Sequence, residues 1–343
     1  MNLVIVGFGN VGKHYFNLLR KNKKIKKVYV LENNPKVISG HKCNFINFNQ
    51  IKKKISTINY AIICTPSYLH YKYAYFFLKN KVNTLIEKPF VISLIHAKKL
   101  IKLKNRIRNV KCWVAFQNRY NLAIKKGLQL NKNRRFGNPF FVDAALYWHR
   151  NNKYYSTSWR GKYISDGGVL FNQAIHLLDM IIYFFGPIKK FNIIAGFNKK
   201  KLQAEDLFTL NLVHKNNIIS NLKATTRSDK DYEMSMNVLC NRGRYMIKGI
   251  SLNKIFYFNQ KNLIIDKKNS EIFPKKYGPI YGMGSGHKKI LKEFLNNKIR
   301  KSSKELSIEN NYYILKLIHS IYNSIFKEKK YSFVTEKEFI YDN

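Results

Sequence analysis

The sequence of 343 residues is poor in cysteine, in acidic side chains and in long hydrophobic runs. Its four cysteines, Cys43, Cys64, Cys112 and Cys240, lie far apart and form no C-x-x-C pair. This spacing excludes a disulfide framework and the common zinc motifs. We therefore expect reduced thiols and no metal centre.

Hydrophobic runs long enough to cross a membrane are missing as well. The most apolar stretch, Val169–Phe185, is interrupted by four polar side chains. Residues 1–6 have neither the basic start nor the long apolar core of a signal peptide. These absences predict a cytoplasmic protein with no membrane partner. The hydrophobic fraction of 45% is nevertheless enough for a sizeable core, and the length suggests two domains.

Acidic residues are few, since 19 Asp and Glu face 63 Lys and Arg and the formal net charge is +44. An excess of this size is typical of proteins that bind nucleic acid or an anionic membrane. However, 51 of the 63 are lysine and they are dispersed, whereas phosphate recognition favours the planar fork of arginine. The composition therefore indicates that the positive charge is a general feature of the amino-acid usage of this chain. It predicts no nucleic-acid partner.

The order of apolar patterns predicts two α/β units. The first third alternates short apolar runs with helical patterns, as in βαβ units, with strands expected at residues 2–6, 27–31, 60–64, 82–86 and 110–116. Successive strands with short turns follow at residues 139–148, 188–195, 206–213, 218–226, 232–239 and 244–248. We expect an N-terminal Rossmann domain with a doubly wound parallel sheet at residues 1–117. A second α/β domain with an open, largely antiparallel sheet should occupy residues 118–343.

The first strand leads into a G-x-G-x-x-G turn that opens a helix, formed by Gly7, Phe8, Gly9, Asn10, Val11 and Gly12. The glycines permit a tight turn, a close approach of backbone to pyrophosphate, and close packing of helix on strand. Glu32 ends the second strand, 20 residues after Gly12, where a carboxylate binds a ribose 2′-hydroxyl and repels a 2′-phosphate. The pattern predicts a site for NAD in preference to NADP.

Further motifs follow the next strands and identify a family. One strand ends in a TP-x-x-x-H motif from Cys64 through Thr65 and Pro66 to His70, and the next ends in Glu87-Lys88-Pro89. With Gln117-Asn118-Arg119-Tyr120 and the segment Gly167–Asp179, they resemble the Gfo/Idh/MocA family of sugar and cyclitol oxidoreductases over nearly the whole chain. The resemblance implies hydride transfer between NAD and a sugar carbon. It also implies cofactor contacts from Cys64, Thr65, Pro66, His70, Glu87, Lys88 and Gln117.

The resemblance assigns catalysis to Lys88 and His176. Lys88 follows a parallel strand, where open α/β sheets bind ligands, and a buried lysine can exchange protons near neutrality. The imidazole of His176 is suited to take a proton from a hydroxyl as hydride leaves. The family often has Asp four residues before this histidine, whereas this chain has Asn172, which cannot titrate. His176 and Lys88 must then share the acid–base work, and Asp179 either orients the imidazole or anchors its helix.

The segment Tyr154–Gly161, YYSTSWRG, is similar to the nucleotide-sugar branch of the family, in particular UDP-N-acetylglucosaminuronate 3-dehydrogenases. Aromatic rings can stack on sugar or uracil, and arginine can grip a carboxylate or diphosphate. The expected substrate contacts are Arg119, Tyr155, Trp159, Arg160, Asn172, Gln173 and His176. Arg150 is a further candidate for binding an anion, and Gly284–His287 is a candidate loop over the site.

These patterns predict an NAD-dependent oxidoreductase that oxidises a secondary hydroxyl, at C3, of a nucleotide-linked sugar such as a UDP-hexuronate. The resemblance implies a homodimer or tetramer that pairs the open sheet of the second domain. A dehydrogenase of a free sugar or of a cyclitol such as inositol is the alternative among enzymes. A non-catalytic NAD-binding or nucleic-acid-binding protein is the alternative outside them.

Overall fold

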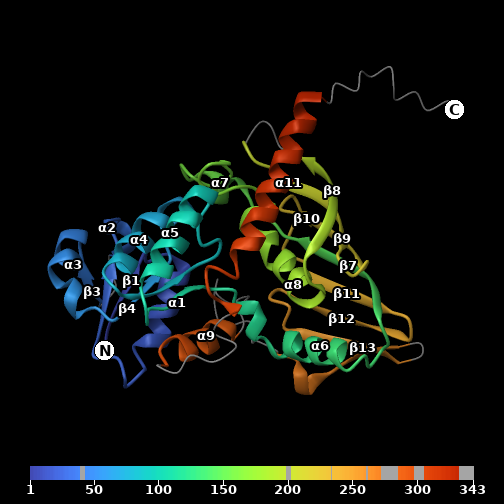
Figure 1. Cartoon of the computed structure of the whole chain (residues 1–343), viewed down its shortest axis with the longest axis horizontal. Helices are drawn as coiled ribbons and strands as arrows, with labels where there is room; N and C mark the ends of the chain where they lie inside the picture. The colour runs from blue at the N-terminus through green and yellow to red at the C-terminus, as the bar shows by residue number, and fades with distance from the viewer. Residues whose placement is uncertain are drawn as a thin grey trace.

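The computed structural model describes residues 1–38, 43–197, 202–232, 234–259, 262–271, 285–296 and 305–331. They form two units that lie side by side (Figure 1). One unit is built on a six-stranded sheet and the other on an eight-stranded sheet. The predicted α/β fold class is confirmed.

The first sheet is parallel throughout, in the order β3-β2-β1-β4-β5-β6. Its strands are β1 (Asn2–Val6), β2 (Lys27–Leu31), β3 (Asn44–Ile46), β4 (Tyr60–Ile63), β5 (Asn83–Ile86) and β6 (Cys112–Val114). The order reverses between β1 and β4, and ligands bind outside the carboxyl ends of the strands at such a switch point. The sequence predicted five of these strands and missed the short β3.

Helices cover the first sheet. They are α1 (Asn10–Leu19), α2 (Pro35–Ile38), α3 (Phe48–Lys54), α4 (His70–Lys79) and α5 (Leu94–Arg106). The central strands are buried on both faces, as the continuous apolar runs NLVIV and YAII require. Ser93 caps α5 by accepting a hydrogen bond from the His96 amide.

The second sheet has the order β14-β13-β12-β11-β7-β10-β9-β8 and is antiparallel except where β7 pairs with β10. Its strands are β7 (Pro139–Tyr147), β8 (Ile188–Gly196), β9 (Leu207–His214), β10 (Ile219–Thr225), β11 (Met234–Cys240), β12 (Gly243–Gly249), β13 (Lys254–Asn259) and β14 (Asn262–Ile265). The sequence analysis did not predict β13 and β14, which form the edge of this sheet. The predicted open, largely antiparallel sheet is confirmed.

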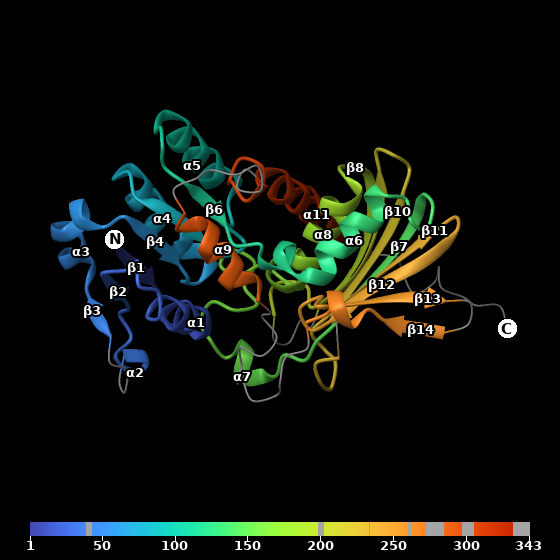
Figure 2. The same ribbon diagram turned by 90° about the horizontal axis from the view of Figure 1, so that it is seen from below.

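Helices α6 (Leu122–Lys132), α8 (Ile175–Phe185) and α11 (Tyr312–Tyr331) cover the face of this sheet that is turned toward the first unit (Figure 2). The short helix α7 (Asn152–Tyr155) lies in the loop that follows β7. Alternation along β9 and β10 places their buried side chains under the helices and leaves the opposite face open. Among the described helices, none is long and apolar enough to cross a membrane.

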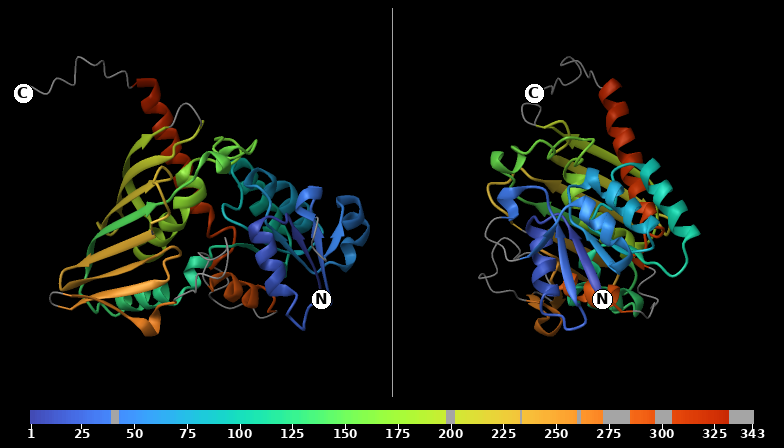
Figure 3. Two further views of the ribbon diagram at one scale, coloured as in Figure 1. Left: turned by 180° about the vertical axis from the view of Figure 1, so that it is seen from behind. Right: turned by 90° about the vertical axis from the view of Figure 1, so that its left-hand side faces the viewer.

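Two segments that follow the second sheet return to the first unit. Helix α9 (Gly286–Phe294) lies beside the first sheet (Figure 3), and the amide of Val114 donates to the Leu306 carbonyl at 2.7 Å. The Lys111 ammonium donates to the Phe294 carbonyl at 3.0 Å. Segments beyond the expected boundary at Gln117 therefore pack against the first unit, and the division at 117 stays a prediction.

Candidate active site

A cavity of about 890 Å³ lies at the carboxyl edge of the first sheet and extends to the loops and helix of the second unit. All predicted cofactor-binding, catalytic and substrate-binding residues line it except Gly12, Arg119 and Tyr155. The cavity has three parts, described in turn: the glycine-rich turn, a centre that contains Lys88 and His176, and an end rich in arginine and aromatic rings.

The glycine-rich turn leaves open space beside its second glycine. Gly7 has φ of +89°, and a Cβ there would lie 2.9 Å from the Cys64 backbone. A Cβ on Gly12 would lie 2.1 Å from the Gly7 carbonyl oxygen, whereas one on Gly9 would meet nothing within 4 Å. Gly9 caps α1 without a side-chain hydrogen bond, so the first amides of this helix can face an anion. The turn fits a pyrophosphate, and Gly12 acts through packing.

Glu32 holds the turn in place as well as facing the cavity. Its Oε2 accepts a hydrogen bond from the Phe8 amide at 2.8 Å. Its Oε1 accepts from the amides of Asn33 and Asn34 at 2.8 and 2.9 Å. Because each carboxylate oxygen has two lone pairs, these contacts leave acceptor capacity for a ribose hydroxyl.

His70 joins the two motif loops. One ring nitrogen lies 2.8 Å from the Pro89 carbonyl and the other lies 2.8 Å from the Thr65 carbonyl. Burial lowers the pKa of His70 despite both carbonyl contacts. The side chain lines the cavity and fixes the loop after β4 against the cis Lys88–Pro89 peptide.

Lys88 lies at the centre of the cavity and reaches across to the second unit. Its ammonium donates to the Asn172 backbone carbonyl at 2.5 Å. Burial lowers the pKa of Lys88 from its ordinary value, against the attraction of Glu87 and Asp166. A lysine in this environment can release a proton more readily than a solvated one.

Glu87 is buried behind Lys88 and belongs to a network that includes the end of the chain. Its Oε1 accepts from the Tyr15 hydroxyl at 3.0 Å and lies 3.5 Å from His287 Nε2. Burial by itself raises the pKa of Glu87, but the contacts with His287, Lys88 and Tyr15 bring it below the ordinary value. An ionised Glu87 therefore supplies the counter-charge for Lys88.

His176 lies on α8 and faces the same central part of the cavity. Burial lowers its pKa well below the ordinary value, and the charges of Lys88 and His287 add to this effect. Its Nδ1 is buried and has no hydrogen-bond partner among the residues that the structure describes. The imidazole is therefore neutral at physiological pH and can accept a proton.

Beside His176, a turn of π-helix, η4 (Leu170–Ala174), carries Asn172 and Gln173. The Asn172 amide nitrogen donates to Asp166 Oδ1 at 2.6 Å, and that of Gln173 donates to the Tyr154 hydroxyl at 3.1 Å. The start of this turn packs against Glu205 so closely that a Cβ on Gly168 would lie 1.9 Å from a carboxylate oxygen. The double glycine is thus required by packing.

The far end of the cavity is cationic and aromatic. The Arg160 guanidinium lies 4.2 Å from the centroid of the Tyr154 ring and 4.9 Å from that of Trp159. The Arg150 guanidinium lies 4.8 Å from the Trp148 centroid and 5.4 Å from that of Tyr154. Two guanidinium groups held on rings are suited to an anionic ligand that also has flat faces.

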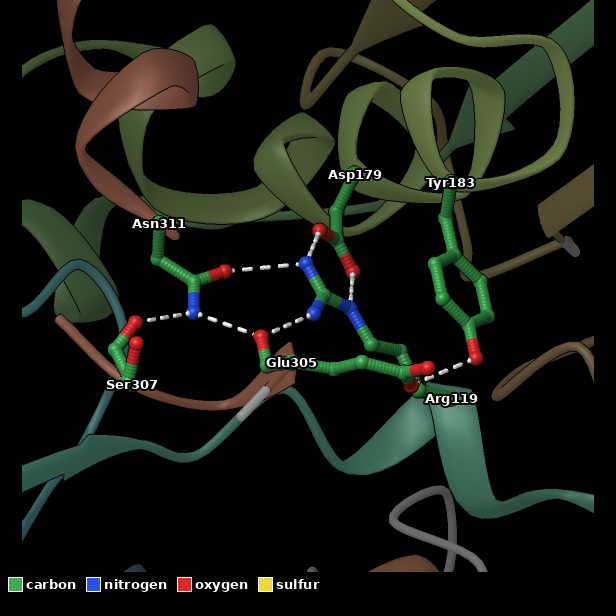
Figure 4. Close-up of polar contacts among 6 residues, drawn as sticks. All are labelled: Arg119, Asp179, Tyr183, Glu305, Ser307 and Asn311. Carbon is green, nitrogen blue, oxygen red and sulfur yellow. Dashed lines mark hydrogen bonds and ion pairs between the residues drawn. The ribbon is translucent and has the colours of Figure 1, made fainter. Parts of the chain in front are cut away.

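Arg119 lies elsewhere, in a polar cluster that joins the two units (Figure 4). Its Nε donates to Asp179 Oδ2 at 3.0 Å, its Nη2 pairs with the other carboxylate oxygen, and its Nη1 donates to the Glu305 carbonyl at 2.7 Å. The guanidinium is thus neutralised by Asp179, and Arg119 does not line the cavity. Asp179 anchors α8 through this pair. Tyr155 lines a neighbouring cavity and lies 2.9 Å from the Thr226 hydroxyl.

The structure adds cavity residues that the sequence analysis did not assign. Asn118 is 1% exposed, and within the described ranges neither of its side-chain polar atoms has a hydrogen-bond partner. Trp148, Asp166 and His287 also line the cavity. In the sequence, Asn118 could have been found from its place in the QNRY motif, and His287 from the candidate loop Gly284–His287. Gly284 itself lies outside the described residues. In the described part of the chain, no group of three or more His, Cys, Asp or Glu could hold a metal ion.

Comparisons with known proteins identify the family. Residues 1–116 match the profile described as "Oxidoreductase family, NAD-binding Rossmann fold", and residues 125–246 match "GFO/IDH/MocA C-terminal domain". A curated relative, 2,7-anhydro-N-acetylneuraminate hydratase of Escherichia coli, is 26% identical over 57% of this chain and 53% of its own length. The chain thus spans about half the length of this relative.

Solved structures share the fold along most of the chain. The WlbA dehydrogenase from Bordetella pertussis, in complex with NADH and UDP-GlcNAcA, has a TM-score of 0.77 at 20% identity, covering 94% of this chain and 95% of its own. UDP-N-acetylglucosamine 3-dehydrogenase GnnA from Acidithiobacillus ferrooxidans has a TM-score of 0.70 at 15% identity, covering 94% and 96%. With its glycine-rich turn and Glu32, the chain has the site of an NAD-binding protein. It belongs to the Gfo/Idh/MocA oxidoreductase family.

Proposed function

We propose that the protein oxidises a secondary hydroxyl, at C3, of a nucleotide-linked sugar such as a UDP-hexuronate. One observation carries the proposal: a single cavity joins the glycine-rich turn, the pair Lys88 and His176, and the end that contains Arg150 and Arg160. A substrate that reaches from the centre to this end must present a hydroxyl at one side and negative charge at the other.

When NAD is bound, its nicotinamide supplies the chemistry of hydride acceptance. His176 takes the hydroxyl proton, because it lines the cavity and burial keeps its imidazole in the neutral form that has an acceptor nitrogen. Lys88 donates a hydrogen bond to the same oxygen and shares the proton as its own lowered pKa allows. Asn172 contributes only hydrogen bonds, because an amide does not titrate.

The arginine-rich end favours a nucleotide sugar over a free sugar or cyclitol. Arg150 and Arg160 lie over aromatic rings; among the residues that the structure describes, Arg150 pairs with Asp231 at 2.9 Å and Arg160 forms no ion pair. A diphosphate or carboxylate at this end of the cavity would compensate the guanidinium charges, whereas an uncharged polyol would not.

The test is a screen of nucleotide sugars, free hexoses and cyclitols, with absorbance of the reduced nicotinamide as the readout. UDP-hexuronates should be oxidised, and kcat/KM should be at least tenfold lower for the corresponding free sugars. In Arg160→Ala this difference in kcat/KM between the two kinds of substrate should disappear. A preference for free polyols would refute the nucleotide-sugar assignment. Binding to nucleic acid with a steep salt dependence, and no turnover with any sugar, would favour the non-catalytic alternative.

We infer that two copies pair through the open face of the second sheet. Tyr147, Ile194, Leu207 and Ile219 on this face are 38–67% exposed, although they are large and apolar. Chain mass by light scattering should indicate a dimer or tetramer. Ile194→Lys with Leu207→Lys should shift it to the monomer because charges then face each other across the interface. A wild-type particle mass equal to that of one chain would refute this inference.

A further inference from the structure

The carboxylate of Asp166 lies on the cavity wall and has no part in the chemistry above. It is 3% exposed and belongs to the loop between Trp159 and the double glycine. Its Oδ2 accepts from the Gly161 amide at 3.0 Å and its Oδ1 accepts from the Asn172 side chain at 2.6 Å. Burying a carboxylate is costly unless it is paired and hydrogen-bonded, so its position beside the cavity calls for a reason.

Asp166 determines which way the Asn172 amide points. Burial raises the pKa of Asp166, whereas the Gly161 amide, the Asn172 side chain and the nearby cations favour its ionised form. The ionised carboxylate can only accept hydrogen bonds, so the NH₂ group of Asn172 faces it. The same NH₂ group is 3.3 Å from the Tyr154 hydroxyl. Since both donors are thereby directed at protein groups, the Asn172 Oδ1 is the polar atom left for a ligand, and it can accept the hydrogen bond of a sugar hydroxyl.

Asp166 is also joined to Lys88. The Lys88 ammonium donates to the backbone carbonyl of Asn172, the residue whose side chain binds Asp166. The negative charge of Asp166 favours the protonated form of Lys88, against the effects of burial and of Arg150. The lysine, the amide and the carboxylate therefore form one connected group on the wall of the cavity.

We propose that Asp166 is a positioning residue, which fixes the Asn172 amide with its oxygen toward the substrate hydroxyl and supports Lys88, whose ammonium donates to the backbone carbonyl of the same Asn172. This inference rests on the proposed function only for the identity of the substrate. In the proposed reaction Asp166 does not touch the reacting atoms. Asp166 acts through Asn172 and Lys88.

The test compares Asp166→Asn with the wild type. An asparagine at 166 has one acceptor and one donor group, so if its oxygen stays on the Gly161 amide its NH₂ group faces Asn172. The Asn172 amide must then rotate and present its NH₂ group to the cavity. We expect kcat/KM to fall by roughly 10-fold or more, the effect of losing one charge-supported hydrogen bond, while NAD affinity is unchanged.

A double-mutant cycle separates this role from simple support of the loop. In the Asn172→Ala background, Asp166→Asn should cost less than about threefold when each variant is measured at its own pH optimum, because the amide it positions is gone. Ser165→Ala is the matched control, since it removes a hydrogen bond of the same loop to the Trp159 carbonyl and contacts neither partner. It should retain wild-type turnover. Costs that multiply in the double variant would overturn the positioning role.

A second readout needs no substrate. The enzyme is acetylated while it is folded and loaded with NAD, and acetylation at Lys88 is then followed by mass spectrometry of peptides. The pH dependence of this acetylation reports the pKa of the Lys88 amine. It should move to lower pH in Asp166→Asn and stay close to the wild type in Asn172→Ala. An unmoved profile would refute the link to Lys88. A wild type that fails to oxidise nucleotide sugars would refute the substrate assignment alone.

Discussion

Glu205, buried under the double glycine, gives the most quantitative test of how the catalytic helix is held. It is 1% exposed, and its Oε1 accepts from the Leu170 amide at 2.8 Å and from the Tyr322 hydroxyl at 2.9 Å. These bonds fix the start of η4, which carries Asn172 and leads into the helix of His176. Burial raises the pKa of Glu205 to about 7.

The sign of the stability effect follows from proton uptake. Between the ordinary value of 4.5 and about 7, the folded protein holds a proton at Glu205 that the unfolded chain has lost. The free energy of unfolding therefore falls as pH rises through this window. At about 1.4 kcal/mol per pH unit, the whole interval corresponds to roughly 3 kcal/mol, of which about 2–3 kcal/mol falls between pH 5 and pH 8.

Glu205→Gln removes this titration with little change of shape. Urea unfolding at pH 5 and pH 8 should show that the variant gains about 2–3 kcal/mol relative to wild type between the two pH values, whatever its offset at pH 5. Tyr322→Phe removes a hydrogen bond that lowers the pKa of Glu205. In that variant the fall in the free energy of unfolding should therefore extend to higher pH than in the wild type. An offset for Glu205→Gln that is equal at both pH values would refute the buried titration.

Three further predictions concern the catalytic pair, the cofactor site and the overall charge. His176→Ala should lower kcat by about 10²–10⁴-fold with NAD affinity nearly unchanged, whereas Lys88→Ala should damage both; near-normal turnover without the imidazole would leave the proton to Lys88 alone. Glu32→Ala should weaken NAD far more than NADP in fluorescence titrations, and equal losses would mean that it acts only by holding the turn. Replacing the exposed lysines 52–54 of α3 with Gln should change kcat/KM by less than a few-fold at physiological salt; a hundredfold fall would show that the global charge matters.

The part of the site that sequence could predict comes from the carboxyl ends of parallel strands. The turn after β1 and the Glu87-Lys88-Pro89 motif after β5 are read locally, and the sheet then brings them to one edge. His70 lines the cavity, but its link to Pro89 depends on two loops meeting in space. Spacing along the chain does not contain that information.

Neighbouring residues in the QNRY motif illustrate what sequence could not decide. Asn118 and Arg119 share one 3₁₀ turn, yet Asn118 lines the cavity and Arg119 faces the opposite way. The direction is set by Asp179 and by the Glu305 carbonyl, which lie 60 and 186 residues away along the chain. His287 likewise reaches Glu87 only because α9 returns to the first unit.

The role of Asp179 follows from competition between two partners. A carboxylate three residues after His176 could bind either the imidazole or a buried arginine. The side chain of Arg119 is 11% exposed, and an unpaired guanidinium at such a place would cost several kcal/mol, so the two-point ion pair with Asp179 prevails. Had the carboxylate bound His176, it would have raised the imidazole pKa and favoured the protonated ring. Because Asp179 is paired with Arg119, burial and the charges of Lys88 and His287 determine the lowered pKa of His176.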